Sequence, residues 1–228
     1  MERRIWLANA HKIRLVLHVA ASVNLGYALY YDYMYVELPA LAVELRLEPP
    51  MGGKFKYLTF LTGLLQTGYY MLALGQDLCH LRTLRQLRDY LLASFVVPLA
   101  LTVSVTFWTL CAINRESIYP PFLDEVYPKW LNRTMHCYVV IYALLELCTT
   151  AHRYPKRGKG YAGLAAVMGC YLIWMHLVHY WTGIWIYPFL DALFGPLRLC
   201  FFALIVGLSF VYYRLGEHIN CVLWANGR

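Results

Sequence analysis

Polar side chains are rare inside the long apolar stretches of this sequence, and two of them have the chemistry of a nucleophile and its base. These are the hydroxyl of Thr59 and the imidazole of His136. An imidazole that takes the proton of a hydroxyl lets the oxygen attack an ester carbonyl, and it can return the proton to the leaving group. The two side chains must lie within hydrogen-bond distance of each other, and a third group must orient the imidazole ring.

Other ionisable groups in apolar stretches have alternative interpretations. His176 and His179 lie one helical turn apart and could offer two metal ligands, but helical ligand pairs are usually spaced i, i+4 and no third ligand is evident. We therefore expect packing roles there and no metal. Glu146 is either a proton-relay or cavity residue, or a buried partner for a hydroxyl.

Composition places this chemistry in lipid. Of 228 residues, 60% are apolar and only 14% charged, which is far more apolar than a soluble domain of this length. The net charge of +7 comes from Lys and Arg in short clusters between apolar runs, which indicates topology signals and not a nucleic-acid surface. The seven cysteines are scattered without a C-x-x-C pair, so we expect neither a disulfide framework nor a cofactor.

The elements that must position the candidate residues are transmembrane helices. A helix of about 18 to 25 apolar residues crosses a bilayer core of roughly 30 Å. We predict an all-α, polytopic membrane protein: one transmembrane domain, 1–228, forming a six-helix bundle. The expected spans are 15–36, 55–78, 90–113, 134–150, 161–185 and 193–213.

Loop charges predict the orientation. Lys and Arg concentrate before the first span, in 82–88 and in 153–159, so these segments and both termini are expected to be cytoplasmic. The connections 37–54, 114–133 and 186–191 are expected outside. Three prolines in 117–132 exclude a continuous helix there, and we expect that segment to cap the outer mouth.

The predicted depth in the membrane places the candidate nucleophile and base in the same layer. The second and fourth spans both enter from outside, and Thr59 and His136 each lie within the first turns, at similar depth. Free backbone N–H groups and the positive dipole end there favour an oxyanion. Asp32 reaches the same layer, whereas Glu146 lies roughly 15 Å deeper by helical rise. The alternatives at this point are an intrahelical hydrogen bond for the threonine and an interhelical one for the histidine.

Five segments occur one after another along the chain: 52–60, 118–120, 130–136, 182–188 and 215–217. In sequence and in order they resemble the androgen-induced protein and androgen-dependent TFPI-regulating protein family. The resemblance covers nearly the whole chain beyond the first span, and it departs at Arg133, where family members usually carry histidine.

The resemblance implies a multipass threonine hydrolase that cleaves fatty acid esters of hydroxy fatty acids. Its nucleophile falls on Thr59 and its essential histidine on His136. Helix N–H groups or Asn132 are candidates for holding the oxyanion. A cation near the mouth would suit the free carboxylate of the substrate, and the candidates are Lys54, Lys56, Lys129 and Arg133.

Two other functions compete with hydrolysis. One is a non-enzymatic lipid-binding or regulatory membrane protein. The other is a transporter that relays protons through Glu146 and His176, which ranks last because paired inverted repeats and broken helices are absent from the sequence. The expected partners are a lipid substrate, the fatty acid ester of a hydroxy fatty acid, and the membrane, with no nucleic acid. We expect the plasma membrane, with the endoplasmic reticulum as the alternative.

Overall fold

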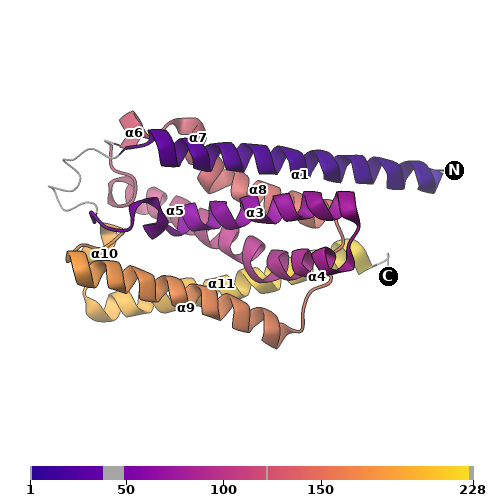
Figure 1. Cartoon of the computed structure of the whole chain (residues 1–228). Helices are drawn as coiled ribbons and strands as arrows, with labels where there is room; N and C mark the ends of the chain where they lie inside the picture. The colour runs from indigo at the N-terminus through magenta and orange to yellow at the C-terminus, as the bar shows by residue number, and fades with distance from the viewer. Residues whose placement is uncertain (1, 38–48, 122, 226–228) are drawn as a thin grey trace.

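The computed structural model describes residues 2–37, 49–121 and 123–225, and all regular secondary structure in these ranges is helical (Figure 1). The long helices are α1 (Glu2–Tyr35), α3 (Leu58–Cys79), α4 (Arg82–Leu91) continuing through η2 (Leu92–Val96) into α5 (Val97–Asn114), α7 (Lys129–Arg133) continuing through η4 (Thr134–Tyr138) into α8 (Val139–Thr149), α9 (Arg157–Thr182) and α11 (Gly195–Trp224). The short ones are η1 (Gly53–Lys56), η3 (Arg115–Ser117), α6 (Leu123–Val126) and α10 (Phe189–Ala192).

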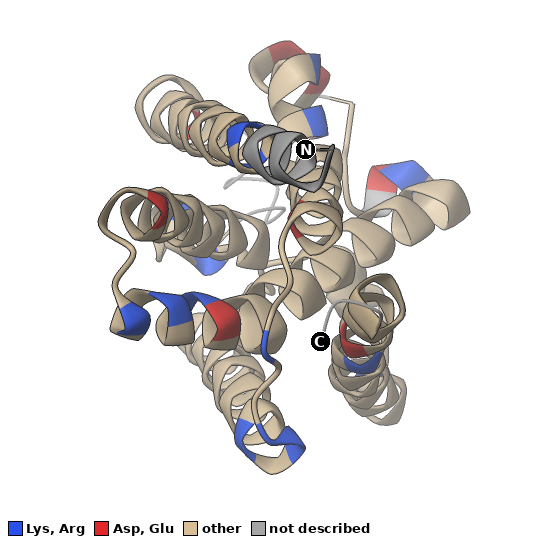
Figure 2. Cartoon of the chain, turned by 90° about the vertical axis from the view of Figure 1, so that its right-hand side faces the viewer, with Lys and Arg blue, Asp and Glu red and all other residues tan. Residues whose placement is uncertain are grey.

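The long helices lie side by side as one bundle, and α1 begins at the end of the bundle where α11 ends (Figure 1). Lys and Arg gather at this end, along α4 and at the start of α9 (Figure 2). Most of the expected outer connection, residues 38–48, and the chain ends at residues 1 and 226–228 lie outside the described residues.

Four helical stretches are long and apolar enough to cross a membrane: His11–Tyr35, Arg82–Asn114, Arg157–Thr182 and Gly195–Trp224. The other two expected spans coincide with α3 and with the α7–η4–α8 stretch, which both carry buried polar side chains. These side chains lower the mean hydropathy of both stretches. The all-helical fold is thus confirmed for the described residues, with four candidate membrane-spanning helices, and the arrangement of six spans remains a prediction.

Helix ends and irregularities follow from local chemistry. His80, with a φ of 55°, ends α3 in the left-handed conformation, and Gly183, with a φ of 67°, ends α9 in the same way. Pro98 has no N–H and would clash with the carbonyl four residues earlier. The helix accommodates it by widening into the π-helical segment η2 just before it.

The apolar core runs between α1, α3, α5 and α8. Its largest buried members include Tyr69, Tyr70, Leu92 and Leu147. A second cluster joins α5 to α9 and α11 around Leu164, Met168 and the fully buried Tyr213. These contacts hold the start of α3, the second half of α9 and the first half of α11 around a cavity at the opposite end from the chain termini.

Candidate active site

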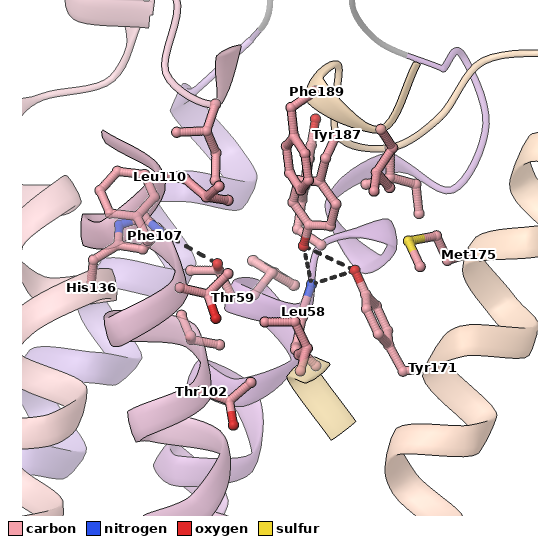
Figure 3. A pocket seen from close by; sticks show the side chains of 18 of the residues that line it. Leu58, Thr59, Thr102, Phe107, Leu110, His136, Tyr171, Met175, Tyr187 and Phe189 are labelled. Carbon is pink, nitrogen blue, oxygen red and sulfur yellow. Dashed lines mark hydrogen bonds between the residues drawn. The ribbon is translucent and has the colours of Figure 1, made fainter. Parts of the chain in front are cut away.

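A cavity with a volume of about 220 Å³ lies at the end of the bundle where α3 begins. Its walls come from the start of α3, the second half of α5, α9, the 186–190 segment and α11. Most of the side chains are apolar, such as Phe107, Leu110, Met175 and Phe189 (Figure 3). Residues 118–120, Leu123 and Tyr127 from the expected cap segment also line the cavity. A mainly apolar cavity with a few polar groups is the usual form of a small-molecule site.

Thr59 and His136 face each other across one wall of this cavity. The Thr59 Oγ1 atom lies 3.4 Å from His136 Nε2, and both side chains line the cavity (Figure 3). Thr59 is the second residue of α3, and His136 is in the π-helical segment η4. The separation is long for a hydrogen bond, but catalytic hydrogen bonds often shorten only when the substrate is bound.

Asn132 holds the other side of the imidazole. His136 Nδ1 is 2.7 Å from Asn132 Oδ1 and 3.1 Å from the Asn132 backbone oxygen. Both are acceptors, so Nδ1 carries the proton and the Nε2 lone pair faces Thr59. This hydroxyl–imidazole–amide arrangement is that of a nucleophile, a base and an orienting group. Asn132 was a candidate for the oxyanion, but its amide lies behind the ring.

The ring of His136 is also fixed by its surroundings. Phe107 stacks on it with the ring centroids 3.6 Å apart and the planes 15° from parallel. Ser104 and Trp108 both donate hydrogen bonds to the His136 carbonyl oxygen. A π-helical segment interrupts the regular i→i−4 pattern, so donors from a neighbouring helix can satisfy such a carbonyl. Neither the π-helical segment nor these supports could be recognised from spacing.

Two tyrosines hold the first turn of α3 close to Thr59. The Leu58 N–H donates to the hydroxyls of Tyr171 and Tyr187, at 3.2 and 3.3 Å, and these hydroxyls lie 2.9 Å apart (Figure 3). Tyr171 also donates to the Lys56 carbonyl oxygen at 3.2 Å. Neither tyrosine is a site residue that the sequence predicts. The only signal was Tyr187 in the matching segment 182–188.

One of the four cations proposed near the mouth lines the cavity. Lys54 Nζ is 3.0 Å from Asp32 Oδ1, and both side chains are part of the wall. Lys56 is buried and donates to the Pro49 carbonyl oxygen. The remaining two, Lys129 and Arg133, are exposed and lie outside the lining.

Glu146 lies outside the cavity and at the centre of a buried polar network. Its oxygens are 2.8 Å from His18 Nε2, 3.2 Å from His152 Nε2 and 3.0 Å from the Tyr69 hydroxyl. The other ring nitrogens of the histidines face Asp77 and Asp89, at 2.7 and 2.9 Å. The contact with Tyr69 corresponds to the interpretation of Glu146 as a buried partner for a hydroxyl.

Like Glu146, His176 and His179 lie outside the cavity lining. Both rings contact Trp185, with centroid distances of 5.3 and 4.0 Å, and His176 Nδ1 donates to the Leu172 carbonyl oxygen at 2.7 Å. Over the described ranges, no group of three or more His, Cys, Asp or Glu side chains is arranged to hold a metal ion.

Comparison with known proteins assigns this sequence to a family. The sequence model of the FAR-17a/AIG1-like protein family matches residues 13–221. The chain belongs to this family. No solved structure matches it significantly.

Curated relatives agree with this assignment, which confirms the resemblance expected from the motifs. The human androgen-induced gene 1 protein is 34% identical over 197 residues, covering 80% of this chain and 83% of the relative. The human androgen-dependent TFPI-regulating protein is 34% identical over 188 residues, covering 78% and 80%. Its counterpart from Mesocricetus auratus is 34% identical over 181 residues, covering 76% and 78%. Family membership and the four apolar helices together indicate an integral membrane protein.

Proposed function

We propose that this FAR-17a/AIG1-like protein is an intramembrane hydrolase that cleaves fatty acid esters of hydroxy fatty acids. The observation that carries the proposal is the Thr59 hydroxyl beside the unprotonated nitrogen of His136, with Asn132 on the other ring nitrogen. These groups border an apolar cavity that suits an acyl chain. Neither the nucleophile nor the base requires a metal or an organic cofactor.

In the first step Thr59 Oγ1 attacks the ester carbonyl carbon while its proton passes to His136 Nε2. The carbonyl oxygen becomes an oxyanion. The Leu58 N–H is bonded to the Tyr171 and Tyr187 hydroxyls, but Thr59 still lies at the positive dipole end of α3, which can stabilise that charge. His136 then gives the proton to the leaving alkoxide, which departs as the hydroxy fatty acid.

In the second step water replaces the hydroxy fatty acid. His136 Nε2 takes a proton from the water, whose oxygen attacks the acyl-threonine carbonyl. Collapse of this second intermediate breaks the bond to Thr59 Oγ1, which recovers the proton from His136. The fatty acid is released and both side chains return to their starting protonation states.

We further infer that all six long helical stretches cross the bilayer, with both termini in the cytoplasm. The support is that α1 begins where α11 ends and that Lys and Arg gather at this end (Figure 2). In this orientation the cavity lies near the outer surface of the membrane, where water is available and a lipid can enter from the bilayer. The plasma membrane is the compartment we propose.

Single substitutions in membranes test the hydrolase. Thr59→Ala and His136→Ala should each lower the hydrolysis of a fatty acid ester of a hydroxy fatty acid by at least about 100-fold, since each removes a partner of the proton transfer. Thr67→Val is the matched control, because Thr67 is on the same helix and its hydroxyl donates to the Gly63 carbonyl oxygen. Wild-type turnover in either alanine variant would rule the mechanism out.

The second candidate is a lipid-binding or regulatory protein without catalysis, and the apolar cavity would serve it equally well. Covalent chemistry separates the two functions. A fluorophosphonate or activated-ester probe should label Thr59 in the hydrolase, whereas a binding protein has no activated hydroxyl at this position.

A further inference from the structure

The cavity contains one ion pair in addition to the proposed catalytic groups. Lys54 Nζ lies 3.0 Å from Asp32 Oδ1, and the side chains are 16% and 6% exposed. Among the described residues that line the cavity, Lys54 and Asp32 are the only members of the Lys, Arg, Asp and Glu types. The rest of the wall is mainly apolar, so this pair is the charged group that a ligand in the cavity can contact.

Lys54 comes directly after a two-glycine turn, a few residues before the nucleophile. Gly52 and Gly53 have φ values of 90° and 50°, in the left-handed region that favours glycine. The short helix η1 follows and carries Lys54, five residues ahead of Thr59. A fully extended chain of that length spans at most roughly 18 Å. One ligand molecule can therefore contact Lys54 and Thr59 at the same time.

We propose that Lys54 is the headgroup site for the free carboxylate of the ester substrate, and that Asp32 is the counterion that holds the ammonium ready. This inference rests on the proposed hydrolase function and names the end of the substrate that is recognised. An ammonium group has three donors, so Lys54 can bond a ligand carboxylate while keeping its contact with Asp32. In an apolar cavity this charge-assisted hydrogen bond is strong.

The two partners have opposite effects on a carboxylate. Lys54 attracts it, and Asp32 repels it because like charges in a poorly solvated site raise the free energy of binding. A neutral ester feels neither effect. The pair therefore makes the enzyme select an ester that also carries a free carboxylate over the same ester with that carboxylate methylated.

The selectivity is measured as the ratio of kcat/KM for a fatty acid ester of a hydroxy fatty acid to kcat/KM for its methyl ester. Lys54→Met should lower this ratio by about 10- to 100-fold, the loss expected from one hydrogen bond to a charged group. Asp32→Asn should raise it. The double variant, which leaves no uncompensated charge in the cavity, should bring the ratio close to one. Lys129→Met is the matched control, since Lys129 is exposed and outside the lining.

A binding measurement distinguishes failure of the headgroup site from failure of the hydrolase. The thermal shift of the purified protein is compared for hexadecanoate and hexadecanol, in wild type and in the Lys54→Met variant. We expect a larger shift with hexadecanoate that disappears in the variant, and this result would support the site even without turnover. Equal shifts for the two ligands, or an unchanged ester ratio in all three cavity variants, would overturn the proposal.

Discussion

His136 is useful as a base only if its proton stays on the nitrogen that faces away from Thr59. The Asn132 side-chain oxygen and backbone oxygen both contact Nδ1, at 2.7 and 3.1 Å, and so select the tautomer. The contact of Nδ1 with the Asn132 backbone oxygen survives any side-chain substitution at this position. By itself it would therefore still favour the same tautomer in part. In the proposed mechanism the amide therefore acts through the histidine, as a positioning residue.

Replacing Asn132 should lower kcat more than it changes KM. In Asn132→Leu we expect kcat to fall by about 10- to 1000-fold, because the ring loses its side-chain acceptor and can turn away from Thr59. Asn132→Asp keeps an acceptor and should recover much of the activity. Arg133→Leu, at the next position but exposed, is the control. A normal kcat in Asn132→Leu would show that the amide does not orient the base.

At the scale of single elements, the sequence indicates which helices carry the candidate residues but not their local form. Apolar runs and loop charges placed Thr59 and His136 at similar depth on helices entering from one side. The spacing of Asn132 and His136, four residues apart on one helix, could have indicated their contact. Segment η4 has no proline to mark it, and the Phe107 contact depends on a different helix, so neither was predictable.

The turn before α3 gives a prediction at this scale. Gly52→Ala should destabilise the protein by about 1–2 kcal/mol, because the position has a left-handed φ of 90°. The added Cβ would also lie 3.1 Å from Lys56 Cβ and 3.3 Å from Trp174 Cζ2. Gly75→Ala, in the interior of α3 with open space around it, should instead be neutral or stabilising. Thermal unfolding in detergent measures both, and equal shifts would contradict the strain at Gly52.

At the scale of the whole molecule, the two ends of the bundle have different roles. The cavity lies at one end, and the network around Glu146 lies at the other, where it ties together α1, α3, α4, α8 and the segment after α8. The depth estimate correctly separated Glu146 from the Thr59 layer. The network itself needs five segments to meet, and long-range pairing of that kind is not contained in local spacing.

The central position of Glu146 predicts a large effect on stability. Glu146→Leu leaves His18, His152 and Tyr69 facing an apolar side chain, and removing one partner from a buried charged network costs about 3–5 kcal/mol. Glu146→Gln keeps an acceptor and should be milder. Folded yield and thermal unfolding report the loss. Turnover per folded molecule should stay within a few-fold of wild type, and a selective loss of kcat with normal stability would contradict a structural role.

The most direct measurement is the mass of the peptide containing Thr59 after the wild-type protein is mixed with substrate and quenched with acid during turnover. The account predicts a fraction of this peptide carrying the acyl group of the ester, bonded through Thr59 Oγ1, and no such adduct in the His136→Ala variant. Rapid hydrolysis by the wild type with the acyl group on another residue would contradict the account. So would rapid hydrolysis by a protein in which a reactive probe fails to label Thr59.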